Sequence, residues 1–264
     1  MRIYKKIYNF VIKKYLRINM KTNQDYKNAA LAALRGNWGK AVVATLIYVL
    51  LISLITGPTV YTTTKIQSQL TELAATHPTG YQAAALITSP EFVAIQAQST
   101  RASGISTLLE FLVMMPLSLG FLNACRRLLV AGDNNFISNT FRIGFGNYWH
   151  KVWGMLLMSI LIFLWSLLLI IPGIIKLFSY AMTPFILEEN PELGASEAIH
   201  RSRMMMRGHK FDLFYLYLSF IGWFLLCLLT AGIGFLWLAP YVDTSLAAFY
   251  EDVKADYALN GGLD

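Results

Sequence analysis

The chain alternates between short amphipathic segments and longer segments that are apolar on every side. The clearest case is residues 163–193, FLWSLLLIIPGIIKLFSYAMTPFILEENPEL, which is apolar up to Pro172-Gly173 and apolar again as far as Glu188. A helix without a polar face is stable in a large core or in lipid. Because this chain is short for such a core and the stretches approach bilayer thickness, the pattern predicts a membrane hairpin that turns at Pro172-Gly173.

The same pattern, followed along the chain, predicts an all-α membrane protein with six transmembrane helices arranged as three hairpins. Each hairpin is preceded by an amphipathic helix whose apolar residues recur at helical spacing. The predicted amphipathic helices are 23–35, 133–145 and 194–207. In the second, Phe136, Ile137, Phe141 and Phe145 form one stripe. The predicted membrane helices are 41–56, 105–123, 152–171, 174–187, 211–230 and 233–250.

These elements suggest an internal repeat in three copies. In each copy an amphipathic helix ends in glycine and a polar residue, a membrane helix follows, and a glycine-containing turn leads to a proline-bearing helix. The prolines are Pro116, Pro184 and Pro240. The copies span about 23–123, 133–187 and 194–250, and the first contains an outer loop, 57–104, predicted to hold one or two short amphipathic helices. Glycine and proline are frequent in membrane helices, so chance similarity stays an alternative.

Composition supports the membrane class, and charge sets an orientation. The 264 residues are 56% hydrophobic and 14% charged, whereas a soluble domain is about a quarter charged. Of 22 Lys and Arg residues, all but Lys65, Arg101 and Lys176 lie in the terminal segments and the amphipathic helices with their flanks. Positive charge marks the cytoplasmic side. We therefore predict that both termini are cytoplasmic, and we assign the net charge of +7 to topology, with no nucleic-acid partner.

Three regions follow from this organisation: a basic N-terminal extension, 1–19; a single membrane domain, 20–254; and a C-terminal tail, 255–264. The extension is basic and aromatic, and MKTNQDYKNAALAAL from Met20 resembles a natural start. We interpret 1–19 either as an over-long start or as a short interfacial helix on the cytoplasmic side. No cleavable signal peptide is recognisable, because the first apolar run begins only near Ala41.

Several motifs resemble a known family. They are GNWGKA (36–41), IPGIIK (171–176), LEENPEL (187–193), EAIHRSRMMMRGHK (197–210), LSFIGW (218–223), GIGFLWLAPY (232–241) and AAFYED (247–252). Together they resemble the bacterial multi-pass membrane family catalogued as domain of unknown function 975, over about residues 20–254. That family is distantly similar to the membrane domain of some glycerophosphodiester phosphodiesterases. The resemblance implies a bacterial cytoplasmic (inner) membrane protein, with no established activity and no catalytic residues to carry over.

Ionisable groups within membrane segments are the first candidates for a functional site. Asp243 lies in the sixth predicted helix, where it is either a proton or cation site or a buried acid bonded to a hydroxyl such as Thr244. Glu110, in the second helix, and Lys176, just past the predicted Pro-Gly turn, lie at similar predicted depth. They either form an interhelical ion pair, or Lys176 extends to the interface on its own.

Charged groups at the predicted cytoplasmic side give two further candidates. Glu188, Glu189 and Glu192 either hold a divalent cation or form a solvated connection between helices. One basic group is expected to bind anionic lipid headgroups. The alternative is that its charges only set the orientation of the chain in the membrane. Its members are Arg201, Arg203, Arg207 and Lys210.

No catalytic, cofactor or metal motif is recognisable. The four histidines lack metal-binding spacing, and GxSxG, P-loop and dinucleotide-binding patterns are absent from the sequence. Cys125 and Cys227 are interpreted as packing thiols. We therefore predict a non-enzymatic membrane protein that organises, regulates or binds other membrane components, including a membrane-protein partner or a second copy of itself. The alternatives are a small transporter or lipid-handling protein with a site between the proline-broken helices, and, ranked last, a lipid-active enzyme.

Overall fold

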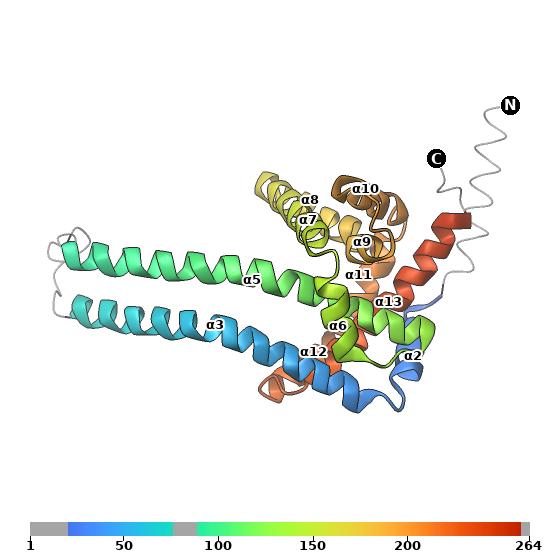
Figure 1. Ribbon diagram of the computed structural model, residues 1–264, viewed down its shortest axis with the longest axis horizontal. Coiled ribbons are helices and arrows are strands. Elements are labelled where there is room, and N and C mark those ends of the chain that lie inside the picture. Colours follow the sequence, from blue (N-terminus) through green and yellow to red (C-terminus); the bar gives the residue numbers. More distant parts are fainter. Residues whose placement is uncertain (1–20, 76–88, 260–264) are drawn as a thin grey trace. The chain divides into compact units, whose positions relative to one another are not determined.

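The computed structural model describes residues 21–75 and 89–259, and every element in these ranges is an α-helix (Figure 1). The interpretation of residues 1–19 therefore lies outside the described chain. The fold divides into two units: unit 1 contains Met1–Leu46 and Pro116–Asp264, and unit 2 contains Ile47–Met115. The helices are α2 (Asn23–Leu34), α3 (Trp38–Ala75), α5 (Pro90–Ala131), α6 (Phe136–Phe145), α7 (Tyr148–Leu168), α8 (Ile170–Tyr180), α9 (Thr183–Glu189), α10 (Ala195–Met205), α11 (Lys210–Leu218), α12 (Ile221–Leu229) and α13 (Phe235–Leu259).

Five stretches within the described helices are long and apolar enough to cross a membrane. They are Trp38–Gly57, Phe111–Ala131, Tyr148–Leu168, Ile170–Glu189 and Lys210–Leu229. A multi-pass membrane protein follows from them, in agreement with the predicted class. The predicted sixth segment, 233–250, forms the first part of α13 and is not among the five.

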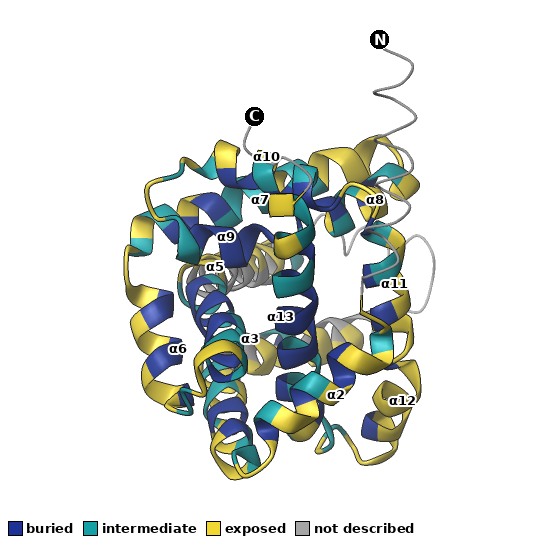
Figure 2. Ribbon diagram, turned by 90° about the vertical axis from the view of Figure 1, so that its right-hand side faces the viewer, coloured by how far each residue is buried: buried dark blue, intermediate teal, exposed yellow. Residues whose placement is uncertain are grey.

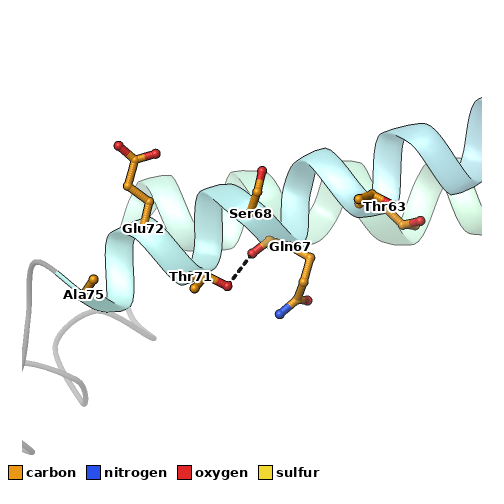
Figure 3. A pocket seen from close by; sticks show the side chains of 7 residues that line it. Thr63, Gln67, Ser68, Thr71, Glu72 and Ala75 are labelled. Atoms are coloured by element: carbon orange, nitrogen blue, oxygen red, sulfur yellow. Dashed lines mark hydrogen bonds between the residues drawn. The ribbon is translucent and has the colours of Figure 1, made fainter.

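The predicted outer loop is wrong in its local structure. Helix α3 has 38 residues and continues without a break through Gly57-Pro58, and α5 has 42 residues. Both helices therefore reach far into the range 57–104 (Figure 1). Threonine hydroxyls of α3 donate hydrogen bonds to backbone carbonyls of the same helix. Thr64 donates to Val60 O at 2.7 Å. Thr71 donates to Gln67 O at 2.9 Å (Figure 3). Alanine, glutamine and leucine favour helix in any solvent, so loss of apolar character did not end these helices.

The turn of the predicted hairpin lies earlier than Pro172-Gly173. The chain leaves helical conformation at Leu169, and Pro172 falls in the first turn of α8. Proline is tolerated there because the first backbone N–H groups of a helix have no partner in the helix. Gly173 serves the packing instead: a Cβ at this position would lie 2.2 Å from Ser166 Oγ of α7. The break between the two helices thus lies at Leu169 and not at the predicted Pro172-Gly173, and the membrane hairpin itself stays a prediction.

Helix α13 lies at the core of unit 1. Every residue from Thr244 to Tyr250 is buried, and the buried colouring of α13 contrasts with the exposed surface of α12 (Figure 2). Helix α2 packs against α13, with the rings of Tyr26 and Phe249 edge to face at 5.4 Å. Thr22 caps the start of α2 by a reciprocal capping box with Asp25.

Two of the apolar stretches are interrupted, and side chains from amphipathic helices occupy both interruptions. Between α8 and α9, Ser202 of α10 donates to Ser179 O at 3.0 Å and accepts from Met182 N at 3.2 Å. Between α11 and α12, the ammonium of Lys27 in α2 donates to Ser219 O at 2.8 Å. Backbone polar groups freed at membrane depth need such partners. The amphipathic helices therefore supply hydrogen-bond partners to backbone groups at the interruptions of the membrane helices.

Helices α5 and α6 cross at two glycines, which gives a direct test of the packing. A Cβ on Gly120 would lie 2.0 Å from Thr140 O, and one on Gly144 would lie 2.5 Å from Pro116 O. We expect Gly120→Ala to lower the free energy of unfolding by about 1–3 kcal/mol, because backbone atoms must separate. Thermal unfolding in detergent measures this. Gly222→Ala in α12, where nothing lies within 4 Å, is the control, and equal stability of the two variants would contradict the crossing.

Candidate functional site

The charged residues of unit 1 gather around Glu189, the last residue of α9. Its carboxylate accepts hydrogen bonds from Arg126 of α5, from the phenol of Tyr250 and, at 2.5 Å, from Lys254 of α13. Arg126 Nε also donates to Glu251 at 2.5 Å. Three helices therefore meet at one half-buried carboxylate. We call Arg126, Glu189, Tyr250, Glu251 and Lys254 the Glu189 network.

The neighbouring Glu188 is paired in the same way. Lys151, a buried lysine of α7, lies 2.6 Å from Glu188 Oε2, and Arg127 lies 3.3 Å from Oε1. The Lys151 ammonium also donates to Ile143 O at the end of α6. Glu188 thus links its own helix, α9, to α5 and α7, and Lys151 extends this link to α6.

Local packing places these acids. Helix α9 has only seven residues and begins with Pro184 in its first turn. Asn123 donates to Pro184 O at 3.2 Å, and Phe185 stacks on Tyr250 with ring centroids 4.4 Å apart. A helix this short is unstable alone, so contacts with α5 and α13 hold it and aim both carboxylates at the cations.

The arrangement pairs Glu188 and Glu189 with the protein's own cations. Glu188 and Glu189 are occupied by basic side chains, and Glu192 is exposed. Among the described residues, no group of three or more His, Cys, Asp or Glu side chains is arranged to hold a metal ion. Of the two interpretations offered by the sequence, neither a solvated connection nor a divalent-cation site describes Glu188 and Glu189.

A second polar contact joins the start of the chain to α13. The Tyr26 phenol donates to Asp252 at 2.7 Å, and burial together with this carboxylate raises the pKa of Tyr26. Beside it, burial lowers the pKa of the Lys27 ammonium, which lies 4.4 Å from the centre of the Phe220 ring. Both residues tie α2 to the helices behind it.

Asp243 lies in α13, two turns before Tyr250. It is half-buried. Thr244 donates to Pro240 O at 2.6 Å, within its own helix. Among the described side chains, no cation lies within ion-pair distance of Asp243. The role proposed for Asp243 from the sequence stays a prediction.

The other two intramembrane candidates belong to different units of the fold. Glu110 belongs to α5 in unit 2, and its side chain is not among those described; Lys176 belongs to α8 in unit 1. The predicted pair stays a prediction. The Lys176 ammonium lies 4.4 Å from the centre of the Trp165 ring and 5.8 Å from that of Tyr180.

The four basic residues predicted to contact lipid differ in their surroundings. Arg201 donates to Asn190 Oδ1 at 3.2 Å, Arg207 is exposed, and Arg203 Nε is buried without a described hydrogen-bond partner. Lys210 begins α11 and is half-buried. The structure therefore singles out Arg203 within this group.

Sequence reasoning missed the Glu189 network. It assigned the lysines and arginines of this network only to the cytoplasmic side, and it gave Tyr250 no role. The available signal was the opposite charge of residues at the predicted cytoplasmic ends of neighbouring helices, since such ends lie at one depth.

The comparison with protein families bears on most of this site. A family model described as "Protein of unknown function (DUF975)" matches residues 167–257. This part of the chain belongs to the DUF975 family. The DUF975 segment includes Glu188, Glu189, Asp243 and Tyr250, and it leaves out Arg126 and the rest of the chain before residue 167. No curated protein and no solved structure matches the chain. The likeness to glycerophosphodiester phosphodiesterases stays a prediction.

We expect Glu189→Gln to destabilise unit 1 strongly. The change removes the charge that faces Arg126 and Lys254, and it should lower the free energy of unfolding by about 3 kcal/mol, the lower end for a buried ion pair that loses one partner. Chemical or thermal unfolding in detergent measures the loss. Glu192→Gln removes an exposed acid three residues away and should leave stability unchanged. If the two variants unfold alike, the Glu189 network does not stabilise the fold.

Proposed function

We propose that this is a non-enzymatic integral membrane protein that acts by associating with other membrane components. The observation that carries this proposal is the division of its surface. The acids at the end of α9 are neutralised internally by Arg126, Lys151 and Lys254, whereas large apolar side chains of α7, α8 and α12 are exposed. Exposed apolar surface of this extent needs lipid or a protein partner.

We propose that the membrane helices form three hairpins and that both termini lie in the cytoplasm. We also propose that the protein lies in the bacterial inner membrane. The bias of Lys and Arg supports this orientation. In this arrangement 233–250 is the sixth span, shielded from lipid by the helices that bury Thr244 to Tyr250. Its low hydropathy relative to the other five is then expected, because a helix surrounded by protein does not need an apolar surface.

Site-specific photo-crosslinking tests the association. A photoreactive residue at Leu226 or Leu229 of α12, both exposed, should yield a discrete protein adduct in native membranes, from a partner or a second copy. The same residue at exposed Glu192 is the control and should not give that adduct. Lipid adducts alone at both α12 positions would contradict the proposal. So would hydrolysis of glycerophosphodiesters by the purified protein, which would favour an enzyme.

A second function is a small transporter, and Asp243 is the observation that favours it. A half-buried carboxylate without a described cation partner, in the helix that contains Pro240, suits a proton or cation site. Vesicles containing the protein and a trapped pH-sensitive dye would report proton flux. We expect flux above that of protein-free vesicles, at least tenfold lower in Asp243→Asn and unchanged in Glu192→Gln. Equal flux through Asp243→Asn removes this role.

A further inference from the structure

Three basic side chains of unit 1 lie near one another without a described acid beside them. Lys176 of α8, Arg203 of α10 and Lys210 of α11 form this group, which we call the Lys176 cluster. Helix α8 packs against both α10 and α11, which brings Lys176 towards Arg203 and Lys210. Lys176 therefore lies on a helix that packs against two segments assigned by the sequence to the cytoplasmic side, which argues against its predicted position near an outer turn.

The fold brings these residues together through one hydrogen-bonded contact. Ser202, next to Arg203, bonds to both Ser179 O and Met182 N, which fixes α10 against the C-terminal end of α8. Lys176 lies about one turn before Ser179 in α8. The short connection after α10 then leads directly to Lys210. The position of the cluster thus depends on Ser202, which also hydrogen-bonds the backbone groups between α8 and α9.

The charges of this cluster are not compensated by the described chain. No described carboxylate lies within ion-pair distance of Lys176, Arg203 or Lys210, although the neighbouring cations Arg126, Lys151 and Lys254 are all paired. Arg203 Nε is shielded from solvent and lacks a described hydrogen-bond partner. A buried guanidinium donor left unbonded is costly, so the site is suited to an anion with several oxygen acceptors.

The surroundings identify the source of that anion as a lipid. Lys176 lies on the ring of Trp165, and Ile174, Ile175 and Leu177 around it are exposed apolar side chains within the apolar stretch Ile170–Glu189. Tryptophan and tyrosine next to lysine and arginine mark the headgroup level of a bilayer. Acyl chains would lie against the isoleucines and leucine while a phosphate reaches the cations.

We propose that Lys176, Arg203 and Lys210 bind the phosphate of an anionic phospholipid from the surrounding bilayer. This inference rests on the proposal that the protein is membrane-embedded, and it narrows the lipid-contacting group predicted from the sequence. Arg203 and Lys210 are retained, Lys176 is added, and Arg201 and Arg207 are left out because one is bonded to Asn190 and the other is exposed.

Lipid titration of the purified protein in a neutral detergent tests the site. Phosphatidylglycerol should raise the unfolding temperature and appear as a bound lipid in native mass spectra, whereas phosphatidylcholine and inorganic phosphate should do neither. Lys176→Gln and Arg203→Gln should each weaken phosphatidylglycerol binding about fivefold, the equivalent of one basic residue near a membrane surface. Arg203→Lys should retain most of the binding, because it keeps the charge.

Arg207→Gln is the matched control, since it removes one positive charge from an exposed residue just beyond the same helix. Equal loss in Arg207→Gln and Arg203→Gln would show general charge attraction and overturn the site. Stabilisation by inorganic phosphate that is sensitive to the same variants would show a free-phosphate site and overturn the lipid source. If Arg203→Gln does not fold, Lys176→Gln decides, because Lys176 forms no described hydrogen bond within the fold. The crosslinks expected at α12 do not depend on this result.

Discussion

The carboxylate of Glu189 is the constraint on which the packing of unit 1 depends. It is half-buried, and it is satisfied only because Arg126, Tyr250 and Lys254 approach it from two other helices. Taking these charges out of water has a large cost, so the network stabilises the fold only while every member is present. Helix α9, with seven residues, has few means of its own to stay in place. Its position therefore follows from the network and from the stacking of Phe185 on Tyr250.

A second constraint is the interruption of apolar helices inside unit 1. Each interruption exposes backbone groups that lipid cannot satisfy, and each is answered by one side chain from an amphipathic helix: Ser202 between α8 and α9, and Lys27 between α11 and α12. The amphipathic helices are thus structural parts of the membrane body. A change that moved α2 or α10 would free backbone groups in the helices they complete.

Short-range pattern was enough to predict much of this fold. The ends of α2, α6 and α10 lie within a few residues of their predicted positions, because an apolar stripe at helical spacing and a terminal glycine are local signals. The stripe of the second amphipathic helix was only partly right. Phe136 is buried, whereas Ile137, Phe141 and Phe145 are exposed, because Thr140 and Gly144 between them pack on Gly120 and Pro116 of α5.

The site could not be predicted in the same way, because its contacts join distant residues. Arg126 and Glu189 are 63 positions apart, and nothing local shows that they meet. Their pairing also changes the meaning of the remaining charges. Once Arg126, Lys151 and Lys254 are assigned to acids, Lys176, Arg203 and Lys210 are among the basic residues left without a described ion pair. An anion bound there would contact α8, α10 and α11 together. Its binding would stabilise the interrupted helix that Ser202 completes, since a ligand of the folded state alone favours that state.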